Sequence, residues 1–175
     1  TYGLVELPKG KRALRNKWVY KVKTGEVDNT PKYKARIVVK GFQQKKGVDF
    51  DEIFAPVMKM TSIRTVLSIT TNMDMEIRQL DIKTTFLHGE LDEEIYMHLP
   101  EGVIDKGKEN LVCRLKKSLY GLKQALCQWY KKFVSFMLEH GFHKTQADHC
   151  VFIKRYDEDD FLILLLYLDD MLIVR

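Results

Sequence analysis

Two stretches near the start of the chain alternate large apolar residues with basic ones. They are residues 17–23 (KWVYKVK) and residues 33–40 (YKARIVVK). Alternation with a period of two is typical of a strand whose two faces differ. Residues 24–31, which separate the two stretches, are rich in turn formers. We therefore predict a β-hairpin.

The same alternation assigns the side chains of the second strand to two faces. Basic residues would lie on one face and apolar or aromatic residues on the other. Such a strand could pack on one side and meet phosphate groups on the other. The basic face would hold Lys32, Lys34 and Arg36, and the second face Tyr33 and Ile37.

The middle of the chain predicts one helix and three strands. After Pro56, Thr61 or Ser62 can cap a helix whose apolar residues recur at helical spacing. Residues 77–82 read as a strand that ends in a carboxylate, followed by short strands at 95–97 and 111–115.

The last third predicts a long amphipathic helix and then three strands. An apolar stripe runs from Leu126 to Met137, and Gly141 is placed to end the helix. Strands follow at 150–153, 161–168 and 171–174. Antiparallel hairpins with two substantial helices indicate an α+β fold, with helices packed on one face of an antiparallel sheet.

Composition indicates a globular chain. Its 175 residues are 45% apolar, enough to bury a core. Uninterrupted apolar runs are too short to span a membrane, so we expect no membrane partner. Three cysteines without regular spacing fit a reducing compartment. The chain stops at Arg175 inside an expected strand, so we expect a fragment of a longer polypeptide.

Charge is unevenly distributed along the chain. Residues 1–50 carry 13 lysines and arginines against 4 acidic residues, whereas the other 125 residues carry 16 against 20. This asymmetry suggests a polyanion bound by the N-terminal third and metal-binding carboxylates elsewhere. A solvated face of lysines would give the same numbers.

Asp169 and Asp170 lie between the apolar runs 161–168 and 171–174. Adjacent carboxylates with apolar neighbours repel each other and are poorly solvated, so a cation would stabilise them. A tight hairpin would present both to Mg²⁺, which prefers oxygen ligands and binds phosphates. Asp81, at the end of its own strand, is the natural third ligand, and three carboxylates could hold two ions.

Five blocks of residues, in order, carry a resemblance to a known family. Tyr167-Leu168-Asp169-Asp170 resembles the Tyr-X-Asp-Asp motif of reverse transcriptases. The other four are similar to the reverse transcriptase domain of Ty1/copia-type LTR retrotransposon polyproteins. They are residues 17–21 (KWVYK), 33–42 (YKARIVVKGF), 81–89 (DIKTTFLHG) and 119–124 (LYGLKQ).

The resemblance implies the fingers and palm of a right-hand polymerase, with the thumb absent. Fingers would comprise residues 1–56 and 89–124, and the palm residues 57–88 and 125–175. The implied activity is that of an RNA-directed DNA polymerase, a nucleotidyltransferase that joins a dNTP to a primer 3′-hydroxyl during retrotransposon replication. The isolated fragment could be inactive.

The resemblance also implies roles for individual residues. Asp81, Asp169 and Asp170 would be catalytic and bind metal, and the backbone carbonyl of Ile82 would add a ligand. Asp170 would matter least among the carboxylates. The substrate-binding residues would be Lys34 and Arg36 on the triphosphate, Phe86 as the steric gate against a 2′-hydroxyl, Tyr120 and Gly121 behind the nucleotide, and Leu168 at the primer end.

Cofactors, partners and location follow from the same resemblance. The cofactor would be two Mg²⁺ ions, with Mn²⁺ as a substitute. Partners would be an RNA template, a DNA primer or duplex, dNTPs, and the remainder of the Pol polyprotein with its thumb and RNase H. An intracellular location is implied, in cytoplasmic virus-like particles, with the nucleus as an alternative.

Two other functions are compatible with the sequence. Leu126 and Cys127 stand where the family usually has Pro or Ser and then Arg. The chain could therefore be a degenerate or host-retained fragment that binds nucleic acid without polymerising. A metal-dependent nuclease could use the same carboxylates but would explain neither Phe86 nor the basic hairpin. The spacing of His140 and His143 does not favour zinc.

Overall fold

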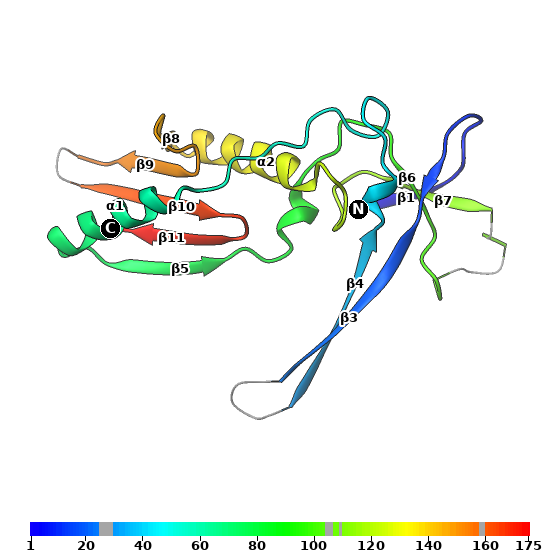
Figure 1. Ribbon diagram of the computed structural model, residues 1–175, viewed down its shortest axis with the longest axis horizontal. Helices are drawn as coiled ribbons and strands as arrows, with labels where there is room; N and C mark the ends of the chain where they lie inside the picture. The colour runs from blue at the N-terminus through cyan, green and yellow to red at the C-terminus, as the bar shows by residue number, and fades with distance from the viewer. Residues whose placement is uncertain (25–29, 104–106, 109, 158–159) are drawn as a thin grey trace. The chain divides into compact units, whose positions relative to one another are not determined.

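The computed structural model describes the chain except residues 25–29, 104–106, 109 and 158–159 (Figure 1). The α+β class is confirmed. The chain divides into two compact units, each made of two segments. One contains Thr1–Ile53 and Phe86–Trp129, and the other Phe54–Thr85 and Tyr130–Arg175.

The predicted basic hairpin is present in the first unit. Strands β3 (Asn16–Thr24) and β4 (Pro31–Val39) pair antiparallel along their whole length. Most of the turn expected between them, residues 25–29, lies outside the described residues. The register places Lys21 opposite Lys34.

The first unit also contains a four-stranded mixed sheet. Its order is β1 (Tyr2–Glu6), β7 (Leu111–Leu115), β6 (Tyr96–His98) and β2 (Ala13–Leu14), with β2 parallel to β6 and the other pairs antiparallel. Leu14, Met97 and Cys113 are fully buried in its core. The 3₁₀ turn η1 (Gly41–Gln43) follows β4.

The second unit is built on a five-stranded, fully antiparallel sheet. Its order is β5 (Ile77–Asp81), β11 (Asp170–Val174), β10 (Phe161–Tyr167), β9 (Val151–Arg155) and β8 (His143–Lys144). The predicted C-terminal hairpin is thus present as β10 and β11. The 3₁₀ turn η2 (Thr85–His88) begins after β5.

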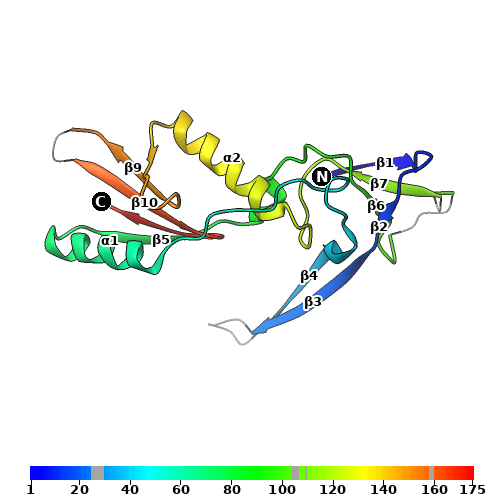
Figure 2. The ribbon, with the colours of Figure 1, turned by 45° about the horizontal axis from the view of Figure 1, so that its top comes forward.

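Helices α1 (Met60–Asn72) and α2 (Ala125–Glu139) contact opposite faces of this sheet, so the expectation of helices on one face is wrong. Ile63 of α1 lines a pocket with Leu165 of β10. Phe133 of α2 packs edge-on against Phe152 of β9, with ring centroids 5.5 Å apart. Phe152 pairs with Leu164 and therefore projects from the face opposite to Leu165. The two ribbon views agree with this placement of the helices (Figures 1 and 2).

The physical reason can be read in β10 itself. Its central residues, 163–166, are apolar without alternation, and all four are buried. A strand that is apolar on both sides needs cover on both faces.

Within the described residues, no helix is long and apolar enough to cross a membrane.

The start of α1 differs from the prediction that Thr61 or Ser62 caps it. Lys59 is the N-cap and forms no capping bond through its side chain. Instead, the buried carboxylate of Asp148 accepts a 2.8 Å hydrogen bond from the Lys59 N–H and another from the Ser62 hydroxyl. The Asp148 carboxylate, although distant in the sequence, thus caps the positive N-terminal end of α1. The end of α2 is as predicted, with Gly141 at a φ of 78°.

Candidate active site

The β10–β11 hairpin turns in two residues, Leu168 and Asp169. Tyr167 pairs with Asp170, so the two strands are joined by the shortest common hairpin loop. Leu168 has a φ of 58°, a conformation that the first residue of a type II′ turn requires and that glycine adopts more readily. The buried residues of β10 fix the register, and with it the strained turn that carries the Asp pair.

Asp81 lies beside this turn. It is the register partner of Asp170 on the neighbouring strand, and directly opposed residues place their Cβ atoms about 4.5–5.5 Å apart on one face. The Ile82 N–H donates to the Asp169 carbonyl at 3.0 Å, so the pairing continues to the tip of the hairpin. The three carboxylates that the sequence separates by up to 89 positions are therefore neighbours, and all three are exposed.

The oxygen atoms of the three carboxylates and of the Ile82 carbonyl suit a hard cation, but they do not form a complete coordination shell. Within the described part of the chain, no three His, Cys, Asp or Glu side chains are arranged to hold a metal ion. Asp81 and Asp170 share a face, while Asp169 belongs to the turn. The Ile82 carbonyl accepts a 2.9 Å bond from the Thr85 hydroxyl, which leaves it one further lone pair. Carboxylate and carbonyl oxygens are the ligands that Mg²⁺ takes.

A pocket of about 300 Å³ opens beside Asp170. Leu165, Leu172 and Ile63 give it apolar walls, and Gln79 lies at its polar side. The Gln79 amide is 3.5 Å from the Asp170 carboxylate, at the limit of a hydrogen bond. Asp170 therefore lines an apolar pocket on one side and lies beside an amide, and it is exposed to solvent.

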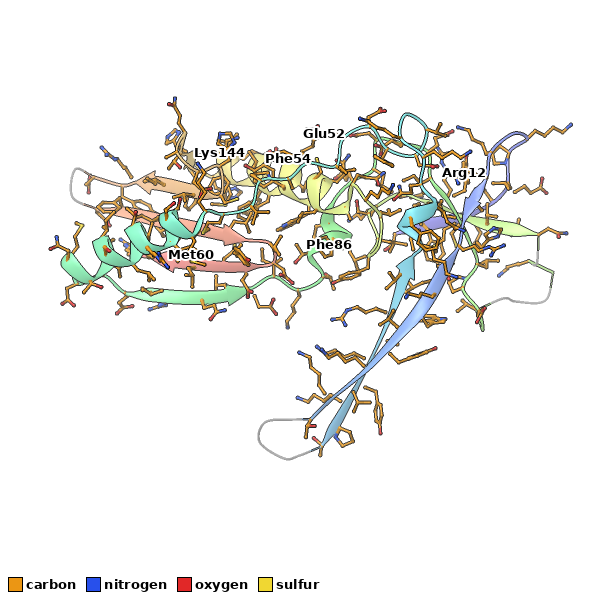
Figure 3. All side chains as sticks on the ribbon, in the orientation of Figure 1. Arg12, Glu52, Phe54, Met60, Phe86 and Lys144 are labelled. Atoms are coloured by element: carbon orange, nitrogen blue, oxygen red, sulfur yellow. The ribbon has the colours of Figure 1, made fainter. Side chains whose placement is uncertain are left out.

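In the first unit, Arg36, Tyr120 and Phe86 form a second cluster. The Arg36 guanidinium carbon lies 5.7 Å from the centre of the Tyr120 ring, within cation–π range. Phe86 meets the same ring edge-on, with centroids 5.1 Å apart and an interplanar angle of 84°. Phe86, labelled in Figure 3, also packs against the core of its unit. Lys34 is exposed on the hairpin, opposite Lys21.

Two glycines hold Tyr120 against the end of β4. The Val39 N–H donates to the Tyr120 carbonyl at 2.8 Å. A Cβ on Gly41 would lie 1.9 Å from the Gly121 carbonyl oxygen, and one on Gly121 would lie 2.1 Å from the Val39 carbonyl oxygen. Gly121 also has a φ of 93°. Neither position admits a side chain, so the two backbone segments can approach closely only because both residues are glycines.

A buried polar network supports the same loop. Gln124 is fully buried; its side-chain oxygen accepts a 2.9 Å bond from the Gln44 amide, and its own amide donates to the Asp49 carbonyl at 2.8 Å. The Gln44 side-chain oxygen accepts from the Lys123 N–H at 2.8 Å. The Asp49 carboxylate pairs with Arg12. No sequence pattern predicts the roles of Gly41, Gln44 and Asp49, because they depend on partners that are distant in the chain.

Leu126 and Cys127 lie in the first turn of α2, which begins at Ala125. Cys127 is buried and Leu126 is half-buried. An arginine at the position of Cys127 would have to be accommodated in a buried environment, which costs free energy unless it is paired.

A hairpin that carries carboxylates in one unit and a cationic hairpin with an aromatic cluster in the other are typical of a nucleotide-polymerising protein. The chain matches the family described as reverse transcriptase (RNA-dependent DNA polymerase) over residues 1–175, and it belongs to that family. The resemblance to Ty1/copia-type polyproteins is confirmed. The chain is thus a reverse transcriptase domain of the kind found in retrotransposon Pol polyproteins.

Three relatives illustrate the similarity. The chain is 63% identical over 174 residues to the retrovirus-related Pol polyprotein from transposon TNT 1-94 of Nicotiana tabacum, covering 99% of this chain and 13% of that protein. It is 41% identical over 157 residues to the Pol polyprotein from transposon RE1 of Arabidopsis thaliana, covering 90% and 11%. It is 29% identical over 164 residues to the Ty1-MR1 Gag-Pol polyprotein of Saccharomyces cerevisiae, covering 93% and 9%. No solved structure matches the chain.

Proposed function

We propose that the chain provides the fingers and palm of an RNA-directed DNA polymerase. The reaction is attack of a primer 3′-hydroxyl on the α-phosphate of a dNTP, with release of pyrophosphate and with RNA, then DNA, as template. The observation that carries the proposal is the pairing of Asp81 with Asp170 beside the turn that holds Asp169. Phosphoryl-transfer centres act by positioning and electrostatics rather than through a covalent nucleophile. Three neighbouring carboxylates that could position metal ions therefore support such a centre.

The proposal divides the chain into fingers at residues 1–56 and 89–124 and palm at residues 57–88 and 125–175. The division into two compact units, with boundaries after residues 53, 85 and 129, supports two functional parts. Thumb and RNase H would be supplied by the remainder of the Pol polyprotein, of which the chain spans 13% or less in the three relatives described above.

The residues that would hold two Mg²⁺ ions, or Mn²⁺ in their place, are Asp81, Asp169 and Asp170, together with the Ile82 carbonyl. When bound, the ions would favour the ionised primer hydroxyl and offset charge on the leaving oxygen. The carboxylates themselves position the cations, and Leu168 at the tip of the turn would lie against the primer end. The fixed register of β5 and β11 keeps Asp81 and Asp170 on one face.

The aromatic and cationic residues of the first unit would select and bind the nucleotide. The Arg36 guanidinium suits a triphosphate because its planar fork donates two parallel hydrogen bonds, and Lys34 adds a point charge. The Phe86 ring would exclude a ribose 2′-hydroxyl by occupying its space. Tyr120 and Gly121 would lie behind the nucleotide, and the Tyr120 ring touches both Arg36 and Phe86.

A second candidate is a degenerate or host-retained fragment that binds nucleic acid without polymerising. Strands β3 and β4 carry six lysines and arginines and no carboxylate, which favours polyanion binding whatever the state of the palm. Leu126 and Cys127, as departures from the family pattern, are compatible with such a history.

Primer extension separates the two candidates. The assay measures Mg²⁺-dependent extension of a DNA primer on an RNA template by this chain, by a longer chain extended toward the C-terminus, and by their Asp169→Asn variants. Extension that Asp169→Asn abolishes, while duplex binding persists, supports the polymerase. A folded, duplex-binding longer chain that never extends the primer supports the non-polymerising fragment. Cleavage of the strand without added nucleotides would instead support a nuclease.

Intracellular location is also proposed, in cytoplasmic virus-like particles with the nucleus as the alternative. Microscopy of the tagged parent polyprotein in its host cell, with Gag as a marker of the particles, would distinguish them.

A further inference from the structure

Gln79 lies on the face of the second unit's sheet that carries Asp81 and Asp170. It stands two positions before Asp81 on β5, the edge strand next to β11 (Figure 1), and side chains two positions apart in a strand project from one face. Its register partner is Leu172, two positions after Asp170. Gln79 is therefore the diagonal neighbour of Asp170, a separation that a long side chain can span.

The Gln79 amide is directed toward the Asp170 carboxylate. Its Nε2 atom lies 3.5 Å from Oδ1 of Asp170. An ionised carboxylate only accepts hydrogen bonds, so the NH₂ end of the amide has to face it. The contact is long, but hydrogen bonds around a reacting centre shorten when substrate fixes the groups. One bond to Oδ1 leaves the second oxygen and the remaining lone pairs of Asp170 for a cation.

An uncharged donor orients a proposed metal ligand at two points of this centre. Within the described residues, the Asp170 carboxylate is the only hydrogen-bond partner of the Gln79 side chain, whose other neighbours in the pocket include the apolar Leu165. The buried Thr85 hydroxyl donates to the Ile82 carbonyl at 2.9 Å. Two of the four proposed ligands are thus each bonded to a neutral donor, which can hold a ligand without offsetting its negative charge.

We propose that Gln79 is a positioning residue for the carboxylate centre and acts by holding the Asp170 carboxylate in one orientation. The inference rests on the proposed function, because it requires that Asp81, Asp169 and Asp170 hold divalent cations. An exposed carboxylate rotates about its side-chain bonds, and fixing one orientation costs conformational entropy when a cation binds. The Gln79 amide restricts that rotation beforehand. A lysine or arginine at this position would also orient Asp170, but its positive charge would repel the cation.

Binding of Mn²⁺, measured without primer or nucleotide, tests this role. The electron paramagnetic resonance signal of free Mn²⁺ gives the Kd for the 175-residue chain and for each variant. Gln79→Met keeps the length of the side chain, suits the apolar pocket and removes the donor. We expect its Kd for Mn²⁺ to rise about tenfold, the lower end of the loss caused by removing a group that orients a metal ligand. Leu172→Met alters the same pocket but keeps the donor, so its Kd should stay within about twofold of the wild type.

A double-mutant cycle with Asp170→Ala shows whether Gln79 acts through Asp170. In the Asp170→Ala background, Gln79→Met should change the Kd for Mn²⁺ by less than about twofold, because the group that Gln79 orients is gone. In a longer chain extended toward the C-terminus, Gln79→Met should raise the Mg²⁺ concentration for half-maximal primer extension about tenfold. The loss in kcat at saturating Mg²⁺ should be smaller. Circular dichroism establishes that all variants are folded.

Other outcomes would overturn the positioning role. If Asp170→Ala weakens Mn²⁺ binding and Gln79→Met does not, the amide does not orient the carboxylate, and the proposed function stands without it. If Gln79→Met causes the same loss with and without Asp170, Gln79 supports the structure of β5 instead. If Asp81→Asn, Asp169→Asn and Asp170→Ala all leave Mn²⁺ binding unchanged, the carboxylates do not hold the cation, and the proposed function fails together with the positioning role.

Discussion

Close contact between two backbone segments makes Gly41 a sensitive single position in the first unit. An added methyl would lie 1.9 Å from the Gly121 carbonyl oxygen, where no flexible side chain can move aside. We expect Gly41→Ala to lower the free energy of unfolding by about 2–3 kcal/mol, the upper part of the usual range for overpacking. Urea denaturation followed by circular dichroism measures it.

Gly3→Ala is the matched control for Gly41→Ala. A Cβ there meets only the Lys116 Cε, at an ordinary 3.7 Å, so the unfolding free energy should change by less than about 0.5 kcal/mol. Equal stability of the two variants would show that the contact between Gly41 and Gly121 is not as tight as the structure has it.

Asp148 makes the stability of the second unit depend on acid pH. Burial raises the pKa of its carboxyl, but hydrogen bonds from the Ser62 hydroxyl and from the Lys59 and Cys150 N–H groups outweigh burial. The pKa therefore lies below its usual value of 3.8. A lowered pKa stabilises the fold above the unfolded-state pKa and loses that contribution as pH falls through the folded-state pKa. Asp148→Asn should be less stable than the wild type at pH 7 by about 1–3 kcal/mol.

The pH dependence is what distinguishes this ionised carboxylate from a merely buried side chain. The difference in unfolding free energy between wild type and Asp148→Asn should be constant from pH 7 to about pH 5 and shrink below about pH 4. Asp157→Asn, at an exposed position, is the control and should give a small difference at every pH. A wild-type advantage at Asp148 that does not shrink in acid would contradict the assignment.

At the scale of elements, the β3–β4 hairpin places like charges directly opposite each other. Lys34→Glu would convert the direct opposition of Lys21 and Lys34 into an opposite-charge pair. We expect the chain to become more stable by about 0.2–1 kcal/mol and to bind phosphate backbones more weakly. Thermal unfolding measures the stability, and fluorescence anisotropy of labelled RNA measures the binding. Lys34→Gln only removes a charge, so its values should fall between those of the wild type and of Lys34→Glu. If Lys34→Glu were less stable than the wild type, Lys34 would make stabilising contacts that outweigh its repulsion from Lys21.

Long elements with a clear period were predictable from the sequence, and short ones were not. The hairpin at residues 16–39, the helix from Ala125 and the C-terminal hairpin follow from periodicity and from turn residues. Strands β2 and β8 have two residues each, too few for any period. The apolar run of β10 predicted a buried strand. Because the run does not alternate, it also implies burial on both faces, and therefore a helix on each side of the sheet.

The candidate site divides in the same way. Asp169 and Asp170 stand out locally, because two carboxylates interrupt an apolar pattern. The pairing of Asp81 with Asp170 depends on strand order, which periodicity does not contain. Gly41 and Gln44 have no local signal, because their roles depend on the Gly121 carbonyl and on Gln124, some 80 residues further along the chain.

At the scale of the whole molecule, the carboxylates and the aromatic cluster belong to different compact units. Asp81, Asp169 and Asp170 lie in one, and Arg36, Phe86 and Tyr120 in the other. If the proposed function holds, changes in one unit should alter the rate of the chemical step, and changes in the other should alter the choice of nucleotide. Rate and selectivity can then be separated by mutation.

Phe86→Ala and Asp170→Asn test this separation. Phe86→Ala removes the ring proposed to exclude a 2′-hydroxyl, so the ratio of kcat/KM for a ribonucleotide to that for the deoxynucleotide should rise about 10- to 200-fold. Asp170→Asn should slow extension with both sugars and leave their ratio unchanged, because the carboxylate would hold the cations and would not contact the sugar. Single-nucleotide extension with dGTP and with GTP, on one primer and template, measures both. An unchanged ratio in a folded and active Phe86→Ala chain would assign Phe86 to the core alone, since it also packs there.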